Sequence, residues 1–116
     1  MPISYKIMPA NIIRVDTVEK LDRLIEASHH KPIFLFKHSN SCGISADIFE
    51  QVGAINGDVH VIIVQQDRPV SNAVTDVLGV RHASPQAFVL KAGRPTYHAT
   101  HYGINPTAIE NKLNEI

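Results

Sequence analysis

The sequence predicts an α/β fold with a mixed central sheet, helices on both faces of the sheet and the element order βαβαβαββα. Over residues 12–79, short β-branched or apolar runs alternate with stretches whose apolar residues recur at helical spacing. Residues 86–99 then indicate two strands joined by a glycine-containing turn, which is typical of an antiparallel hairpin. Since the chain has 116 residues, is 44% hydrophobic and shows no internal repeat, we expect one domain over residues 1–116.

The first three elements follow from local patterns. Residues 12–15 are a short β-prone run, and Asp16 with Glu19 three residues later resembles a capping box, which predicts a helix to about residue 30. Residues 33–36 are continuously apolar, as in a strand buried on both faces, so this run should be the central strand. The apolar stripe of the first helix comprises Val18, Leu21, Leu24 and Ile25.

The spacing predicts two further helices, over residues 42–53 and 67–79, separated by a β-branched strand over residues 59–64. Pro69 stands early in the second of these helices, where its missing N–H is tolerated. After the hairpin, Asn105 is a cap followed by a proline and opens the last helix. The apolar stripes of the three helices are Ile44, Ile48, Phe49 and Val52, then Val70, Val74, Val77 and Leu78, and finally Ile109, Leu113 and Ile116.

Charge and composition argue against several functional classes. Eleven basic residues balance eleven acidic ones, so nothing predicts binding to nucleic acid or to an anionic membrane. No window has the length and hydrophobicity of a membrane span, and residues 1–6 do not resemble a signal peptide, so we expect a soluble cytoplasmic protein. The single cysteine excludes a disulfide-stapled scaffold, and the spacing of the seven histidines does not favour a zinc site.

Cys42, the only cysteine, is the strongest candidate for chemistry. It stands at the start of a predicted helix, where unpaired N–H groups and the positive end of the dipole favour the reactive thiolate. Ser45 occupies the place of the second cysteine in a C-x-x-C motif, so the chain cannot form an internal disulfide. A buried, inert cysteine is the alternative, but the polar residues 37–41 ahead of it predict a solvated turn.

The neighbours of Cys42 each allow two interpretations. Ser45 is either an inert serine on the helix surface or a group that assists the thiolate. Lys37 and His38 either tune Cys42 electrostatically or mark where the strand emerges into water, and for Lys37 we favour the second interpretation. Pro85, taken alone, would be a proline of an edge strand.

A C-x-x-S motif at a helix start, together with Pro85 directly ahead of the hairpin, resembles the layout of a thioredoxin-like domain. The finer resemblance is to the YtxJ family of monothiol bacilliredoxins. It rests on residues 36–45 (FKHSNSCGIS), 68–72 (RPVSN) and 80–86 (VRHASPQ). Gly43 departs from the family pattern, in which proline is common at this position, and glycine would loosen the first turn of the helix.

This resemblance implies thiol–disulfide exchange that removes bacillithiol from mixed disulfides on cytosolic proteins, with Cys42 as the nucleophile. The partners would be S-thiolated client proteins and a low-molecular-weight thiol such as bacillithiol as co-substrate, with no resident cofactor or metal. It also implies a cis peptide bond before Pro85 and a Ser84 that offers its backbone to the substrate. We expect a monomer or a weak dimer.

The remaining site residues follow from the same resemblance and from the chemistry of the thiolate. Ser45 and the N–H groups near Gly43 and Ile44 would hydrogen-bond the thiolate. His38 would line the substrate site. Because bacillithiol carries a malate and arginine pairs well with carboxylates, the remaining candidates for substrate contact are Arg68 and Arg81.

Two other functions fit parts of the sequence. The segment C-G-I-S at residues 42–45 is close to the C-G-F-S signature of monothiol glutaredoxins, which carry a [2Fe–2S] cluster between two subunits. A redox-inert thioredoxin-like interaction module is the third hypothesis. Ile44 in place of phenylalanine, and the sequence around Arg68 and Ser84, favour thiol exchange.

Overall fold

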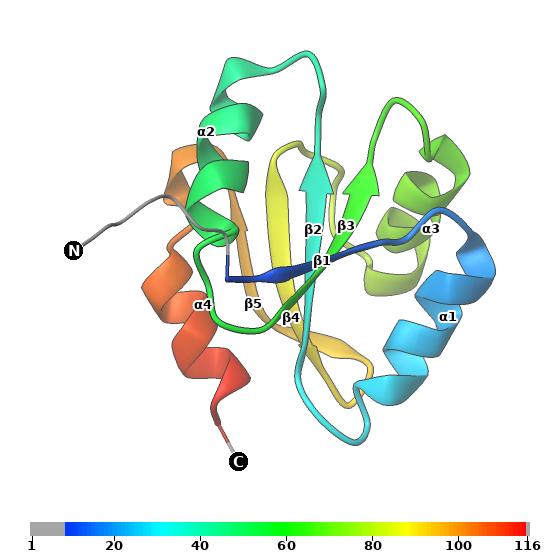
Figure 1. Ribbon diagram of the computed structural model, residues 1–116. Coiled ribbons are helices and arrows are strands. Elements are labelled where there is room, and N and C mark those ends of the chain that lie inside the picture. Colours follow the sequence, from blue (N-terminus) through cyan, green and yellow to red (C-terminus); the bar gives the residue numbers. More distant parts are fainter. Residues whose placement is uncertain (1–8, 116) are drawn as a thin grey trace.

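The computed structural model describes residues 9–115, which fold into a five-stranded mixed sheet with helices on both faces (Figure 1). The strands are β1 (Asn11–Arg14), β2 (Ile33–His38), β3 (Asp58–Ile63), β4 (Gln86–Lys91) and β5 (Arg94–Thr100). The helices are α1 (Val18–Ala27), α2 (Gly43–Val52), α3 (Arg68–Leu78) and α4 (Pro106–Leu113), with a short 3₁₀ helix η1 (His101–Gly103). The predicted element order and fold class are confirmed.

The sheet has the spatial order β1-β3-β2-β4-β5, so β2 is its central strand, as predicted. β2 runs parallel to β3 and antiparallel to β4, and β4 and β5 form the expected hairpin. The first five residues of β2 are buried, as expected for a strand covered on both faces. However, the strand continues to His38, two residues beyond the predicted apolar run.

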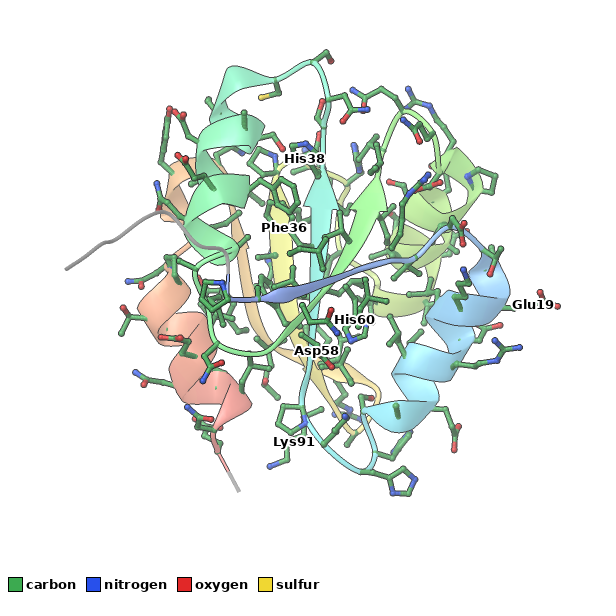
Figure 2. All side chains as sticks on the ribbon, in the orientation of Figure 1. Glu19, Phe36, His38, Asp58, His60 and Lys91 are labelled. Carbon is green, nitrogen blue, oxygen red and sulfur yellow. The ribbon has the colours of Figure 1, made fainter. Side chains whose placement is uncertain are left out.

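Alternate residues of β2 contribute to two hydrophobic clusters, one on each face of the sheet. Phe34 and Phe36 pack under α2 and α4, whereas Ile33 and Leu35 pack under α1 and α3. The alternation continues to the end of the strand, so its last two residues, Lys37 and His38, point to opposite faces. Figure 2 shows Phe36 and His38 on the side of β2 that faces α2.

The helix ends confirm most of the predicted capping signals. Asp67 is the N-cap of α3, and Gly79 closes that helix with a positive φ of 69°. The capping box at Asp16 was wrong: Thr17 is the N-cap of α1, and its hydroxyl accepts a hydrogen bond from the Lys20 N–H at 3.1 Å. Asp16 instead forms an exposed ion pair with the Lys20 ammonium at 2.7 Å.

The C-terminal part also follows the predicted pattern. Ala92 and Gly93 both have positive φ, 55° and 79°, as a two-residue hairpin turn requires. Asn105 caps α4 by accepting hydrogen bonds from the N–H groups of Thr107 and Ala108. Ile116, expected on the apolar stripe of α4, lies outside the described residues. None of the helices within residues 9–115 is long and apolar enough to cross a membrane.

Candidate functional site

Cys42 is the N-cap residue of α2, in the loop that follows the carboxyl end of β2. Its thiol is partly exposed rather than enclosed in the core, and it makes no capping hydrogen bond to the first turn of the helix. The first N–H groups of a helix have no partner inside the helix. The sulfur therefore lies at a helix start whose partial positive charge favours an anion.

The segment that leads to the cysteine, residues 39–42, is named the cysteine loop. It is held by Gln65, which follows β3. The Gln65 amide nitrogen Nε2 donates to the hydroxyls of Ser39 (2.7 Å) and Ser41 (3.0 Å). The Gln65 oxygen Oε1 accepts a hydrogen bond from the Asn40 N–H at 3.0 Å. One neutral side chain thus fixes three consecutive residues of the loop.

Ser45 is fully buried in the first turn of α2, so it is not a serine of the helix surface. Its Oγ accepts a hydrogen bond from the Ser39 N–H at 2.9 Å and lies 2.9 Å from His38 Nδ1. Burial lowers the pKa of His38, so we assign a neutral ring whose Nδ1 accepts the Ser45 hydroxyl proton. Among residues 9–115, no hydrogen bond joins either side chain to the Cys42 sulfur.

The segment between α3 and β4, residues 79–85, is named the proline loop. The peptide bond between Ser84 and Pro85 is cis, as the resemblance implied. Gln86 pairs with Lys37 across the antiparallel strands β4 and β2, so Pro85 lies beside the end of β2 from which the cysteine loop departs. The Pro85 carbonyl accepts a hydrogen bond from the His101 N–H at 3.0 Å, which ties η1 to the same end of the sheet.

Lys37 is fully buried, which contradicts the interpretation that the strand emerges into water at this residue. Its Nζ donates to His82 Nδ1 of the proline loop at 3.1 Å, so the loop lies over this end of β2. Burial lowers the pKa of Lys37 to about 8. Desolvation, followed by the charges of Lys37 and Arg68, lowers the pKa of His82, so the ring is neutral and accepts the hydrogen bond.

Gln86 is the second buried polar residue beneath the proline loop. Its Nε2 donates to the Arg81 carbonyl at 2.9 Å and lies 2.9 Å from His98 Nε2, and its Oε1 accepts from the Ala83 N–H at 3.3 Å. Gln86 is not among the site residues predicted from the sequence. The available signal was a polar side chain at the start of a run that is otherwise apolar.

Tyr102 is a further residue at the site that was not predicted from the sequence. It belongs to η1, is 65% exposed, and its hydroxyl donates to Asp47 Oδ2 of α2 at 3.2 Å. Partial desolvation, the hydrogen bond to Asp47 and the negative charges of Asp47 and Cys42 raise the pKa of Tyr102. An exposed aromatic ring therefore lies at the rim of the cysteine site.

The other predicted residues surround the two loops. Gly43 is exposed and has open space where a side chain would be, whereas Ile44 is half-buried against the core under α2. Arg68 begins α3 and Arg81 lies in the proline loop. Both arginines are exposed, and neither forms an ion pair with a carboxylate in the described part of the chain.

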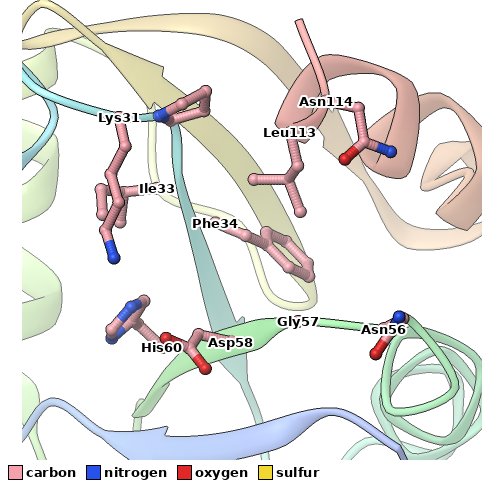
Figure 3. Close-up of a pocket in the computed structure, with 10 residues that line it drawn as sticks. Lys31, Ile33, Phe34, Asn56, Gly57, Asp58, His60, Leu113 and Asn114 are labelled. Atoms are coloured by element: carbon pink, nitrogen blue, oxygen red, sulfur yellow. The ribbon is translucent and has the colours of Figure 1, made fainter.

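A cavity of about 240 Å³ lies at the opposite end of the sheet (Figure 3). Its lining includes Phe34 and Asp58, which stand at the amino ends of β2 and β3. The cavity is thus remote from Cys42 and does not belong to the candidate site. Within residues 9–115, no group of three or more His, Cys, Asp or Glu side chains is arranged to hold a metal ion.

A lone cysteine at the start of α2, at the same end of the sheet as a cis-proline loop, defines a thioredoxin-fold protein with a single thiol at its site. The comparison with protein families gives the more specific class. The family of the monothiol bacilliredoxin BrxC matches residues 13–109, and the chain belongs to this family of thiol redox proteins.

Comparison with solved structures supports the same fold. A candidate oxidoreductase with a thioredoxin fold is 30% identical and superposes with a TM-score of 0.79, covering 87% of this chain and 92% of its own. Thioredoxin from Fasciola hepatica is 17% identical, with a TM-score of 0.68 and coverage of 87% and 95%. Thioredoxin from Trypanosoma brucei brucei is 14% identical, with a TM-score of 0.67 and coverage of 96% and 95%. The last two comparisons bear on the fold alone.

Proposed function

We propose that this protein removes bacillithiol from mixed disulfides on cytosolic client proteins through Cys42. The observation that carries the proposal is a lone, partly exposed thiol at the N-terminus of α2, at the sheet end that also carries the cis Ser84–Pro85 bond. Membership of the monothiol bacilliredoxin family supports the choice of the small thiol.

In the first step, the Cys42 thiolate attacks the bacillithiol sulfur of the mixed disulfide. A new disulfide forms between Cys42 and bacillithiol, the old disulfide bond breaks, and the client leaves as a thiolate. The N–H groups of Gly43 and Ile44, together with the helix dipole, stabilise the attacking thiolate. The backbone of Ser84 binds the client chain beside the reacting sulfur atoms.

In the second step, the thiolate of another bacillithiol molecule attacks the bacillithiol sulfur held on Cys42. This releases bacillithiol disulfide and returns the Cys42 thiolate. Over both steps, one free bacillithiol is oxidised to the disulfide level while the client sulfur is reduced to a thiol. An external thiol is needed because Ser45 stands where a resolving cysteine would be. Ser45 and His38 contribute indirectly, because their hydrogen bonds fix the cysteine loop that carries the nucleophile.

The charge around the proline loop suits a thiol that carries carboxylates. Arg68 and Arg81 are exposed, and the charges of Lys37 and Arg68 both act on His82, so this side of the site has a positive potential. The malate of bacillithiol would bind Arg68 and Arg81, which present planar donors suited to carboxylates.

The experiment is the release of bacillithiol from a purified bacillithiolated client in the presence of excess free bacillithiol. The wild-type protein should catalyse the release, and Cys42→Ser should abolish it, because a hydroxyl is not a nucleophile for disulfides at neutral pH. A second arm replaces bacillithiol by cysteamine, a thiol without carboxylates, in both the client adduct and the solution. The wild-type protein should release cysteamine more slowly than it releases bacillithiol. Full activity of Cys42→Ser would refute the proposal.

A further inference from the structure

We propose that Lys37 and Gln86 are positioning residues that hold the proline loop in the conformation that receives the client chain. The inference rests on the proposed function, since it assigns the loop a role in binding the client. Neither side chain touches a reacting atom, because both are fully buried beneath the loop.

The proline loop contains no helix or strand, yet three consecutive residues of it are bound from below. Gln86 binds the Arg81 carbonyl and the Ala83 N–H, and Lys37 binds the ring of the residue between them, His82. The loop is therefore held on both its backbone and a side chain, directly ahead of the cis bond.

The two buried residues form one unit. Lys37 and Gln86 are directly paired across β2 and β4, so their side chains lie on the same face of the sheet. They close the end of the apolar cluster that contains Leu35 and Phe88. Both strands have a neighbouring strand on each side, so the unit is a rigid base for the loop.

Stability alone does not explain a lysine at this place. A buried cation loses its hydration, and within residues 9–115 no carboxylate pairs with Lys37. Apolar residues of similar volume at such positions are often neutral or stabilising. The ammonium does, however, supply a strong donor to His82 Nδ1, which an apolar side chain cannot.

The first test measures the loop itself by limited trypsin digestion, because Arg81 is an exposed tryptic site within the loop. Lys37→Met and Gln86→Met should each speed cleavage after Arg81 by about fivefold, the equivalent of one lost hydrogen bond. Cleavage after Arg23, an exposed residue of helix α1, is the internal control and should not change. Ser71→Ala is the matched control variant, since Ser71 Oγ lies 3.5 Å from His82 Nδ1 and carries no charge.

The second test separates positioning from folding by comparing two substrates. A bacillithiolated protein uses the loop, so its KM should rise about tenfold in each variant with little change in kcat. A small aromatic disulfide has no chain to place beside Ser84, so its rate of reaction with Cys42 should stay at the wild-type value. The melting temperature of Lys37→Met should not fall, because the change removes an uncompensated buried charge.

Wild-type cleavage after Arg81 and a wild-type client KM in both variants would overturn the inference. An equal loss of reactivity toward the small disulfide would also overturn it, because it would show a general defect in Cys42. If the wild-type protein released no bacillithiol from any client, the proposed function would fail and the client-binding role with it. The digestion would then show separately whether the two residues hold the loop.

Discussion

The two loops that flank the candidate site are held in chemically different ways. The cysteine loop is fixed by neutral groups: the Gln65 amide binds three of its residues, and Ser45 binds the Ser39 N–H with His38 behind it. The proline loop is fixed by a buried ammonium, that of Lys37, together with the Gln86 amide.

This difference suits two separate structural roles at one site, which are to hold the cysteine loop and to hold the proline loop. Neutral hydrogen bonds around the cysteine loop hold Cys42 in place without adding a charge beside its sulfur. A cation beneath the proline loop holds that loop, and its charge acts on His82 together with the charge of Arg68. The last two residues of β2 carry out both tasks, because Lys37 and His38 point to opposite faces of the sheet.

The largest expected effect is the pH dependence that Lys37 gives to stability. Its pKa is about 8 in the folded chain and 10.5 when unperturbed, so between these values the unfolded chain binds more protons than the folded one. The free energy of unfolding should therefore rise with pH across this window, by up to about 3 kcal/mol, and the gain should disappear as pH falls through 8.

Lys37→Met is the reference for this measurement, since other groups also titrate in the same window. Urea unfolding of both proteins at several pH values from 7 to about 10.5 gives the difference between their free energies. We expect the free energy of unfolding of the wild-type protein to rise relative to that of the variant as pH increases. A difference that stays constant with pH would show that Lys37 is not the buried cation described above.

Ser45→Ala should have the next largest effect, and it acts on the cysteine loop. The change removes the partner of the buried Ser39 N–H and of the half-buried His38 Nδ1, which should lower the free energy of unfolding by about 1–3 kcal/mol. Urea unfolding at pH 7 measures this loss in the free energy of unfolding. Ser41→Ala, on the exposed side of the same loop, should change stability by less than about 0.5 kcal/mol. Equal effects of the two changes would contradict the importance of the buried contact.

Gly43→Pro should give the smallest effect, and a favourable one. Gly43 is the first residue of α2 and has open space around it, and Cys42 has φ −119° and ψ 120°, a conformation that a residue before proline adopts readily. We expect a gain of about 0.4–1 kcal/mol from the stiffer unfolded chain. Gly79→Ala is the control with the opposite sign, because Gly79 has a positive φ of 69°. A loss of stability in Gly43→Pro would show that the start of α2 is not as described.

The sequence was sufficient to predict the fold, because each element carries its own signal. The period of apolar residues gave the helices, the continuous run at residues 33–36 gave the central strand, and Gly79 and Asn105 marked helix ends. The N-cap of α1 was misplaced by one residue because Asp16 and Thr17 are both good capping residues. Only the backbone geometry distinguishes them.

The location of Cys42 was also predictable, since it depends on the start of one helix. The surroundings were not, because they depend on pairing between distant strands. In the sequence, Lys37 looks like a residue at a strand end, and only its contact with His82 of the proline loop shows why it is buried. The burial of Ser45 likewise depends on His38, which the strand places beneath α2. Local patterns do not report such long-range contacts.

The most direct test of the central claim is the mass of the protein after one turnover without free bacillithiol. The protein is mixed with an equal amount of bacillithiolated client, quenched with acid and analysed by intact-mass and peptide mass spectrometry. We expect a gain of one bacillithiol group, located on the peptide that contains Cys42, with an equal amount of client freed. Client release with no adduct on Cys42, or no transfer at all, would contradict it.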